Sequence, residues 1–310
     1  PVALWPADRP LPTQAELDAR SRESEDRLAE RMRSGRDGCE VTTTALVFFE
    51  DIVSLATSGL YEPSRIVYID AWNTAYQSLQ DALFLAKFNY DTEITEFRVA
   101  GGVYRADRVA GENTLDPELS IELPGLSYNQ ISQEFVGVKS LKGGYAGRGA
   151  KNPDERDLEL YPTVFTGDLL GDDDAENFAN YLDNTKVLFL PNETELNGIT
   201  IEHARVAAHE LRWMTNCTVR YCFAFGDDLP MERNDRSPIF ARDARIVGNI
   251  FHNNRAEAYG GALTPRGFVV VANSRFLQNT APAGGAIGIR FGEAAELIAQ
   301  NVYFAANIAD

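Results

Sequence analysis

An acidic loop with two glycines is the densest group of chemically capable side chains in the sequence. It runs from Gly167 to Asn177 as GDLLGDDDAEN. Several carboxylates in one turn-rich loop can surround a hard cation such as Ca²⁺, which takes six to eight oxygen ligands, and glycines let such a loop curl. The loop lacks the D-x-[DN]-x-[DN]-G spacing of an EF-hand. A solvated acidic loop is the simpler interpretation, and a Ca²⁺ site is the alternative.

Cysteine and histidine are too sparse to indicate a disulfide framework or a zinc site. The cysteines are Cys39, Cys217 and Cys222, and no C-x-x-C spacing occurs. Cys217 and Cys222 either bridge a corner of the chain or remain as two buried free thiols. The histidines His203, His209 and His252 are not paired at ligand spacing. We therefore interpret each histidine as a surface or hydrogen-bonded structural residue.

Charge and composition restrict the class of protein. The chain has 310 residues, is 44% hydrophobic and carries a formal net charge of −17, which argues against nucleic acid or an anionic membrane as a partner. No apolar run approaches the length of a membrane span. The start, PVALWPADRP, lacks the basic and apolar regions of a signal peptide. We expect a secreted or cell-surface protein whose signal has been removed or lies outside this numbering.

The elements that position these side chains follow an internal repeat. A phrase F-x-x-N recurs at spacings of 25 and 28 residues, and a phrase G-G-A-aliphatic follows its first two copies. The repeated residues are Phe251, Asn254, Gly260, Gly261, Phe276, Asn279, Gly284, Gly285, Phe304 and Asn307. Self-similarity at this period is the signature of a solenoid.

Local sequence favours a β-solenoid over a helical one. Apolar runs such as Phe268–Val271 are too short for the helices of a helical repeat. Glycine pairs and Asn-Ser or Asn-Thr steps separate them and suit corners. Coils stacked at the strand spacing of about 4.8 Å would place each Phe in an internal stack and each Asn in a corner ladder. Regular coils are expected from about Leu196.

These phrases resemble the repeat of polymorphic outer-membrane proteins, which are right-handed parallel β-helices of the pectate-lyase-like superfamily. Upstream, IVYIDAWNTAYQSLQDALFLAK, EFRVAGGVYR and VKSLKGGYAGRGAKNPDERDLELYPTVFTGDLLGDDDAEN are also similar to that family. The resemblance covers residues 66 to 310 and implies an all-β parallel β-helix. Because the family carries an acidic loop at the same place, it singles out Asp168, Asp172, Asp173 and Asp174 as the candidate metal ligands.

The superfamily includes polysaccharide lyases and hydrolases, so an enzyme is one alternative. A lyase of this fold needs a basic side chain near carboxylates that hold Ca²⁺ against an acidic sugar. The available cations are Lys142, Arg148, Arg205, His209 and Arg212. No pairing with carboxylates is visible, and the net charge repels a polyuronate. We therefore assign no catalytic residue.

The first 60 residues differ in character and are interpreted as an arm and cap, with residues 61 to 310 forming the β-helix. A charged helix from about Thr13 to Arg33 precedes an apolar segment, Val41 to Leu60, which with a helix at Ser78–Lys87 would cover the open strand edges of the first coil. The arm of one copy could dock on the last coil of the next.

We predict that the protein is a non-catalytic structural or adhesive module. Its expected partners are other copies of the chain or a polysaccharide. The alternative is a calcium-dependent polysaccharide lyase.

Overall fold

The computed structural model describes residues 66–69, 79–80, 82–83, 96–109, 112–123, 127–129, 134–136, 139–226, 237–289 and 295–309. All of these except Ile66 belong to one compact unit, Val67–Tyr90 and Thr95–Asp310. The arm and the Val41–Leu60 segment lie outside the described residues. Of the helix expected at Ser78–Lys87, the described residues 79–80 and 82–83 are helical. Its predicted apolar face is buried at Leu79, Ala82 and Leu83.

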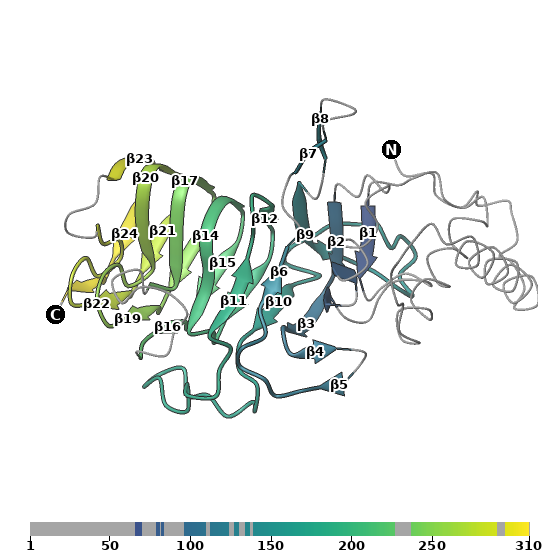
Figure 1. The fold of residues 1–310 in the computed structure, drawn as a ribbon, viewed down its shortest axis with the longest axis horizontal. Helices are drawn as coiled ribbons and strands as arrows, with labels where there is room; N and C mark the ends of the chain where they lie inside the picture. The colour runs from purple at the N-terminus through teal and green to yellow at the C-terminus, as the bar shows by residue number, and fades with distance from the viewer. Residues whose placement is uncertain are drawn as a thin grey trace, which may run out of the picture. The chain divides into compact units, whose positions relative to one another are not determined.

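The predicted β-solenoid is confirmed, because parallel strands stack coil upon coil in three sheets (Figure 1). The first sheet runs β1 (Ile66–Ile69), β2 (Glu96–Ala100), β9 (Ser140–Tyr145), β12 (Glu195–Asn197), β14 (Val206–Thr215), β17 (Ile239–Val247), β20 (Leu263–Ala272), β23 (Ala295–Gln300), with β11 (Val187–Leu190) and β6 (Ile121–Glu122) attached through β14. The second sheet contains β3 (Gly102–Arg105), β10 (Thr163–Thr166), β13 (Thr200–Glu202), β15 (Thr218–Arg220), β18 (Ile250–His252), β21 (Arg275–Leu277) and β24 (Tyr303–Ala305). The third contains β16 (Phe223–Ala224), β19 (Arg255–Ala256), β22 (Thr280–Ala281) and β25 (Ile308–Ala309).

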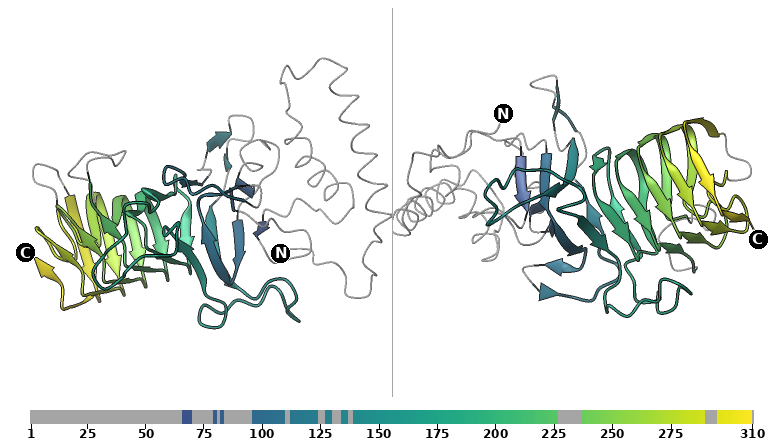
Figure 2. Two further views of the ribbon diagram at one scale, coloured as in Figure 1. Left: turned by 90° about the horizontal axis from the view of Figure 1, so that it is seen from below. Right: turned by 180° about the vertical axis from the view of Figure 1, so that it is seen from behind.

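In the last four described coils, which begin at β14, β17, β20 and β23, the chain visits the three sheets in the same order, and each strand lies beside its equivalent in the next coil (Figure 2). In the first sheet the parallel register aligns Met214 with Ile246 and Ile246 with Val271. In the second sheet it aligns Phe251 with Phe276 and Phe276 with Phe304. The repeat spacing in the sequence is therefore the length of one coil.

Two corners link the sheets, and each turns on one residue with positive φ. At the first corner, between the first and second sheets, these residues are Gly198, Asn216, Gly248, Asn273 and Asn301. Glycine and asparagine adopt this conformation most readily. At the second corner, between the second and third sheets, they are His203, Tyr221, Asn253, Gln278 and Ala306. This second set includes residue types that rarely take positive φ, so other contacts must hold that corner.

The interior of the coils is filled by aligned side chains. The Phe251 and Phe276 rings stack at 4.5 Å between centroids, and those of Phe276 and Phe304 at 5.2 Å. Phe251 and Phe276 are fully buried, whereas Phe304 in the last described coil is 48% exposed. A smaller cluster of buried apolar side chains combines Ala224, Ala256 and Ala281 of the third sheet with Val187 and Val206 of the first.

Asparagine side chains form a ladder just beyond the second corner. Oδ1 of Asn254 accepts from the Cys222 N–H at 3.1 Å, that of Asn279 from the Asn254 N–H at 3.0 Å, and that of Asn307 from the Asn279 N–H at 2.9 Å. Each amide also donates to a backbone carbonyl of the preceding coil, at Val219, Phe251 and Phe276 respectively. The ladder thus ties successive coils together along the stacking direction.

The two cysteines of this region are buried free thiols, which decides between the two alternatives left open above. Cys217 occupies the first-corner position of Asn249, and Cys222 the ladder position of Asn254. Burial raises the pKa of each thiol to about 12. They therefore act as small apolar corner residues rather than nucleophiles.

A corner divides the segment Trp213–Val219 between two strands, because Asn216 turns the chain between β14 and β15. Upstream, β8 (Glu134–Val136) pairs antiparallel with β7 (Ser127–Asn129) outside the three sheets of the solenoid. A second hairpin joins β4 (Arg108–Val109) and β5 (Glu112–Asn113). Stacking reaches back to β2 and β3, with long excursions before the compact coils that follow β12.

Candidate functional site

The predicted acidic loop leaves the second sheet at the end of β10 and returns at β11. Two of its carboxylates shape the loop itself. Asp168 accepts from the Gly171 N–H at 2.6 Å through Oδ1 and from the Asp173 N–H at 3.4 Å through Oδ2. Asp174 accepts from the Glu176 N–H at 2.9 Å and from the Asn177 amide. These are side-chain turn bonds of the kind that Asp favours.

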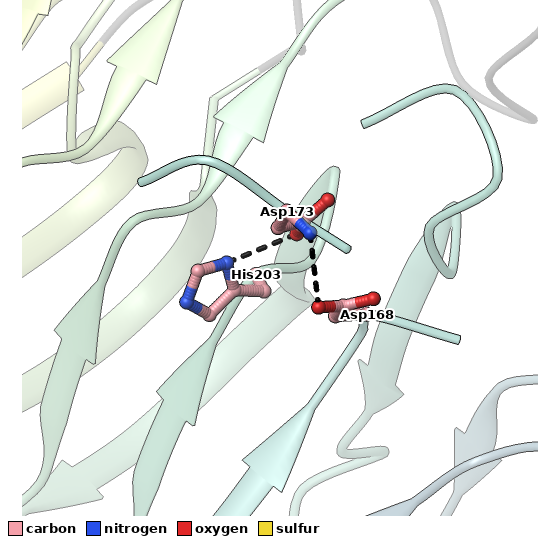
Figure 3. A group of neighbouring side chains, drawn as sticks. All are labelled: Asp168, Asp173 and His203. Atoms are coloured by element: carbon pink, nitrogen blue, oxygen red, sulfur yellow. Dashed lines mark hydrogen bonds and ion pairs between the residues drawn. The ribbon is translucent and has the colours of Figure 1, made fainter. Parts of the chain in front are cut away.

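Among the four predicted ligands, Asp173 has a fully buried side chain. Its Oδ2 accepts from the Asn184 amide at 2.6 Å and lies 2.9 Å from Nδ1 of His203 (Figure 3). Burial raises the pKa of Asp173, and the hydrogen bonds from His203 and Asn184 offset that only in part. Binding of a proton or a cation by this carboxyl would therefore offset the cost of burying its charge.

The predicted ligands fall into two overlapping groups. Ligand atoms of Asp168, Asp173 and His203 lie within 4.8 Å of one another, and so do those of Asp168, Asp172 and Asp183. Asp174 belongs to neither group. Asp168, Asp172 and Asp173 thus lie in these two groups together with Asp183 and His203, which sequence reasoning did not include. Metal binding by the predicted ligands stays a prediction.

His203, which was interpreted from the sequence as a surface or hydrogen-bonded structural residue, is hydrogen-bonded and lies beside the acidic loop. It follows β13 directly, and Asp168 follows β10, the strand that pairs with β13 in the coil below. Register aligns Thr166 with Glu202, so both residues emerge at the same corner of adjacent coils. Strand pairing of T-V-F-T with T-I-E was the signal that could have found this contact.

Aromatic side chains close the loop over the second corner. The Tyr181 hydroxyl donates to the Tyr221 carbonyl at 2.8 Å and lies 3.0 Å from Nδ1 of His203. The Phe178 ring lies against Phe223 at 5.4 Å. Burial raises the pKa of Tyr181, so its phenol stays protonated. These contacts bring the loop to the coil that follows β13.

A second candidate site, which sequence reasoning did not predict, lies on the outer face of the first sheet. It is a pocket of about 450 Å³ across β12, β14 and β17. Its lining side chains combine an aromatic ring with charged groups of both signs: Lys139, Glu193, Glu195, Trp213, Thr215, Arg245 and Val247. Trp213 is 38% exposed, and register places Arg245 beside it. The volume falls within the usual range for small-ligand pockets.

The five basic side chains considered as catalytic groups lie at different places in the structure and make different contacts. The Arg205 guanidinium is buried, lies 4.5 Å from the Phe225 ring centroid and donates to the Phe225 carbonyl. His209 stacks on Phe240 at 5.0 Å. Lys142 pairs with Glu96, Arg212 lies 3.5 Å from Glu193, and Arg148 is exposed. None of the five lines the Trp213 pocket.

No protein-family description, curated protein or solved structure matches the chain. The site must therefore be judged on its own geometry. Among the residues that the structure describes, no helix has the length and apolar character needed to cross a membrane.

Proposed function

We propose that this chain is a non-catalytic structural and adhesive β-solenoid of a secreted or cell-surface protein, related to the polymorphic outer-membrane and pectate-lyase-like β-helices, and that it binds a polysaccharide. The observation that carries the proposal is the Trp213 pocket. A half-exposed indole offers an apolar face to a sugar ring, and adjacent carboxylates and cations can bond its hydroxyls. A regular sheet presents these groups on a rigid surface.

The assignment of a binding rather than a catalytic role has separate support. Lys142, Arg205 and His209 contribute to packing and ion pairs at different places along the solenoid. The interior of the coils is filled by Phe stacks and asparagine ladders, which supply rigidity. A scaffold of this kind needs no reaction centre to position a ligand.

Retention on immobilised polysaccharides tests the proposal. The chain is passed over neutral and uronic-acid polysaccharides, and the Trp213→Ala variant is compared with Phe268→Ala. Phe268 is a suitable control because it is 46% exposed on β20 of the same sheet but does not line the pocket. We expect Trp213→Ala to lower affinity at least tenfold and Phe268→Ala to leave it unchanged. Equal retention of both variants, or no retention of the parent chain on any polysaccharide, would refute the proposal.

One observation favours the second candidate, a calcium-dependent polysaccharide lyase. Lys139 and Arg245 share the pocket with Glu193 and Glu195, so basic and acidic groups do meet there. A lyase would generate unsaturated sugar ends, which absorb in the near ultraviolet, from a polyuronate in the presence of Ca²⁺. Appearance of that absorbance with the parent chain and its loss in Arg245→Gln would establish the enzyme in place of the adhesive module.

A further inference from the structure

The excursion between β10 and β11, which contains the acidic loop, has an unusual concentration of side-chain oxygens without hydrogen-bond partners. Among the described residues, every buried side-chain oxygen without a hydrogen-bond partner lies between Asp173 and Thr185. The four atoms are Oδ1 of Asp173, Oδ2 of Asp183, Oδ1 of Asn184 and Oγ1 of Thr185. Buried acceptors left unpaired are costly and rare, and in proteins such groups are paired by ordered water or by a bound cation.

Two of these oxygens lie directly at the Asp168–Asp173–His203 group. The Asp173 side chain is fully buried and belongs to the group itself. Asn184 is also fully buried, and its Nδ2 donates to Asp173 at 2.6 Å and to the His203 carbonyl at 2.6 Å. Two buried side chains that carry an unpaired oxygen, Asp173 and Asn184, are therefore part of or in contact with the group where two carboxylates and an imidazole converge.

The spacing of the group suits a small divalent ion. Around a tetrahedral ion with bonds of about 2.1 Å, ligand atoms lie about 3.4 Å apart. Oδ2 of Asp173 and Nδ1 of His203 are 2.9 Å apart, and all three ligand atoms lie within 4.8 Å of one another. Small side-chain rotations would bring them to a common centre.

The ligand types favour a transition metal over Ca²⁺. Imidazole nitrogen with carboxylate oxygen suits Zn²⁺ and its neighbours, whereas Ca²⁺ takes oxygen ligands only. An oxygen-only site would instead use Asp168, Asp172 and Asp183. The two groups share Asp168, so the identity of the remaining ligands distinguishes the two ions.

We propose that Asp168, Asp173 and His203 bind a divalent transition metal of the Zn²⁺ class, with Asn184 orienting the Asp173 carboxylate. The ion joins the loop after β10 to the corner after β13 and so fastens the excursion to the solenoid. Water completes the coordination. The site is on the second corner, and it is independent of the polysaccharide pocket on the first sheet.

The test titrates the untagged, chelator-treated chain with Zn²⁺, Mn²⁺ or Ca²⁺ and follows heat of binding and thermal midpoint. We expect one equivalent of Zn²⁺ to bind and to raise the midpoint by several degrees, because the ion binds only the folded state. Asp173→Asn and His203→Gln should each weaken Zn²⁺ binding at least tenfold. His252→Gln is the matched control, because His252 lies at the same corner but bonds Gln278.

His203→Gln keeps the test valid if the buried Asp173 variant fails to fold, since the His203 side chain is 17% exposed. Far-ultraviolet circular dichroism checks that each variant keeps its β-structure. Absence of Zn²⁺ binding, or Zn²⁺ binding that survives His203→Gln, overturns the proposal. Ca²⁺ binding that is lost in Asp172→Asn and Asp183→Asn but kept in His203→Gln overturns it in favour of the oxygen-only site.

Discussion

At the scale of single residues, the side chains that recur in the sequence serve stacking rather than chemistry. Asn279 uses both ends of its amide: Oδ1 accepts from Asn254, and Nδ2 donates to the Phe251 carbonyl and to Asn307. Being fully buried, it has no water to replace these partners. Asparagine therefore recurs in the repeat because of its hydrogen bonds. These bonds stabilise the second corner, where several residues have an unfavourable positive φ.

Asn279→Ala is expected to lower the free energy of unfolding by about 2 to 4 kcal/mol, because it leaves the Asn254 N–H and the Phe251 carbonyl buried and unpaired. Denaturant unfolding followed by circular dichroism measures the loss. Asn152→Ala, in an exposed turn, is the control and should change it by less than about 0.5 kcal/mol. Similar losses in both variants would show that the ladder does not stabilise the coils.

Glu96 gives the stability a defined pH dependence. Burial raises the pKa of Glu96, but hydrogen bonds from Lys142 and Arg98 lower it by more, so the pKa lies below its ordinary value. The folded state then binds the Glu96 proton less readily than the unfolded state does. The stabilisation is complete above the ordinary pKa of about 4.3 and is lost as the pH falls through the folded-state pKa.

Glu96→Gln should therefore destabilise the chain at about pH 6 and much less at an acidic pH below the folded-state pKa, where the parent side chain is also neutral. Urea unfolding midpoints at the two pH values measure the difference. Lys142→Met removes one of the two cationic partners and should show a smaller decline of the same kind, because Arg98 stays paired with Glu96. A destabilisation by Glu96→Gln that does not change with pH would contradict this account.

At the scale of elements, the glycine pairs after the third sheet are required by close approach of backbones. A Cβ on Gly261 would lie 2.1 Å from the Gly285 carbonyl oxygen, and one on Gly285 would lie 2.2 Å from that of Ile308. Neither position needs positive φ. The G-G-A phrase thus marks where adjacent coils pack without room for a side chain.

Gly261→Ala is expected to cost about 3 kcal/mol of stability, because backbone atoms of the neighbouring coil must move apart. Gly149→Ala separates this steric effect from a conformational one, since Gly149 has a φ of 85° but no atom within 4 Å of the added Cβ. That variant should cost only about 1 kcal/mol. Thermal unfolding compares them, and an equal cost in the two variants would rule out the close-approach explanation.

Regular repetition is what made the fold predictable from the sequence. F-x-x-N and G-G-A recur because stacked coils impose the same environment at each level, so Phe251, Asn254 and Gly261 carry the prediction. The excursions have no such constraint, and for that reason His203 was not connected with Asp168. The Trp213 pocket was missed because the outer row of a sheet can be identified only once the register of β12, β14 and β17 is known.

At the scale of the whole molecule, the last described coil exposes apolar side chains. Tyr303, Phe304 and Ile308 are 60%, 48% and 53% exposed on β24 and β25. Head-to-tail association, with a second copy covering this coil, stays a prediction. Light scattering across a concentration series should show growth beyond the monomer, and Phe304→Asp should abolish it. A monomer at every concentration would contradict it.

The central claim is that the solenoid binds a polysaccharide at Trp213 without cleaving it. The most direct measurement incubates the chain with the polysaccharide that it retains best, recovers the complex and determines the molecular mass of the released polysaccharide. The account predicts that the mass is unchanged after prolonged incubation with or without Ca²⁺, while Trp213→Ala recovers little polysaccharide. A mass that falls with time, or recovery that Trp213→Ala does not affect, would contradict the account.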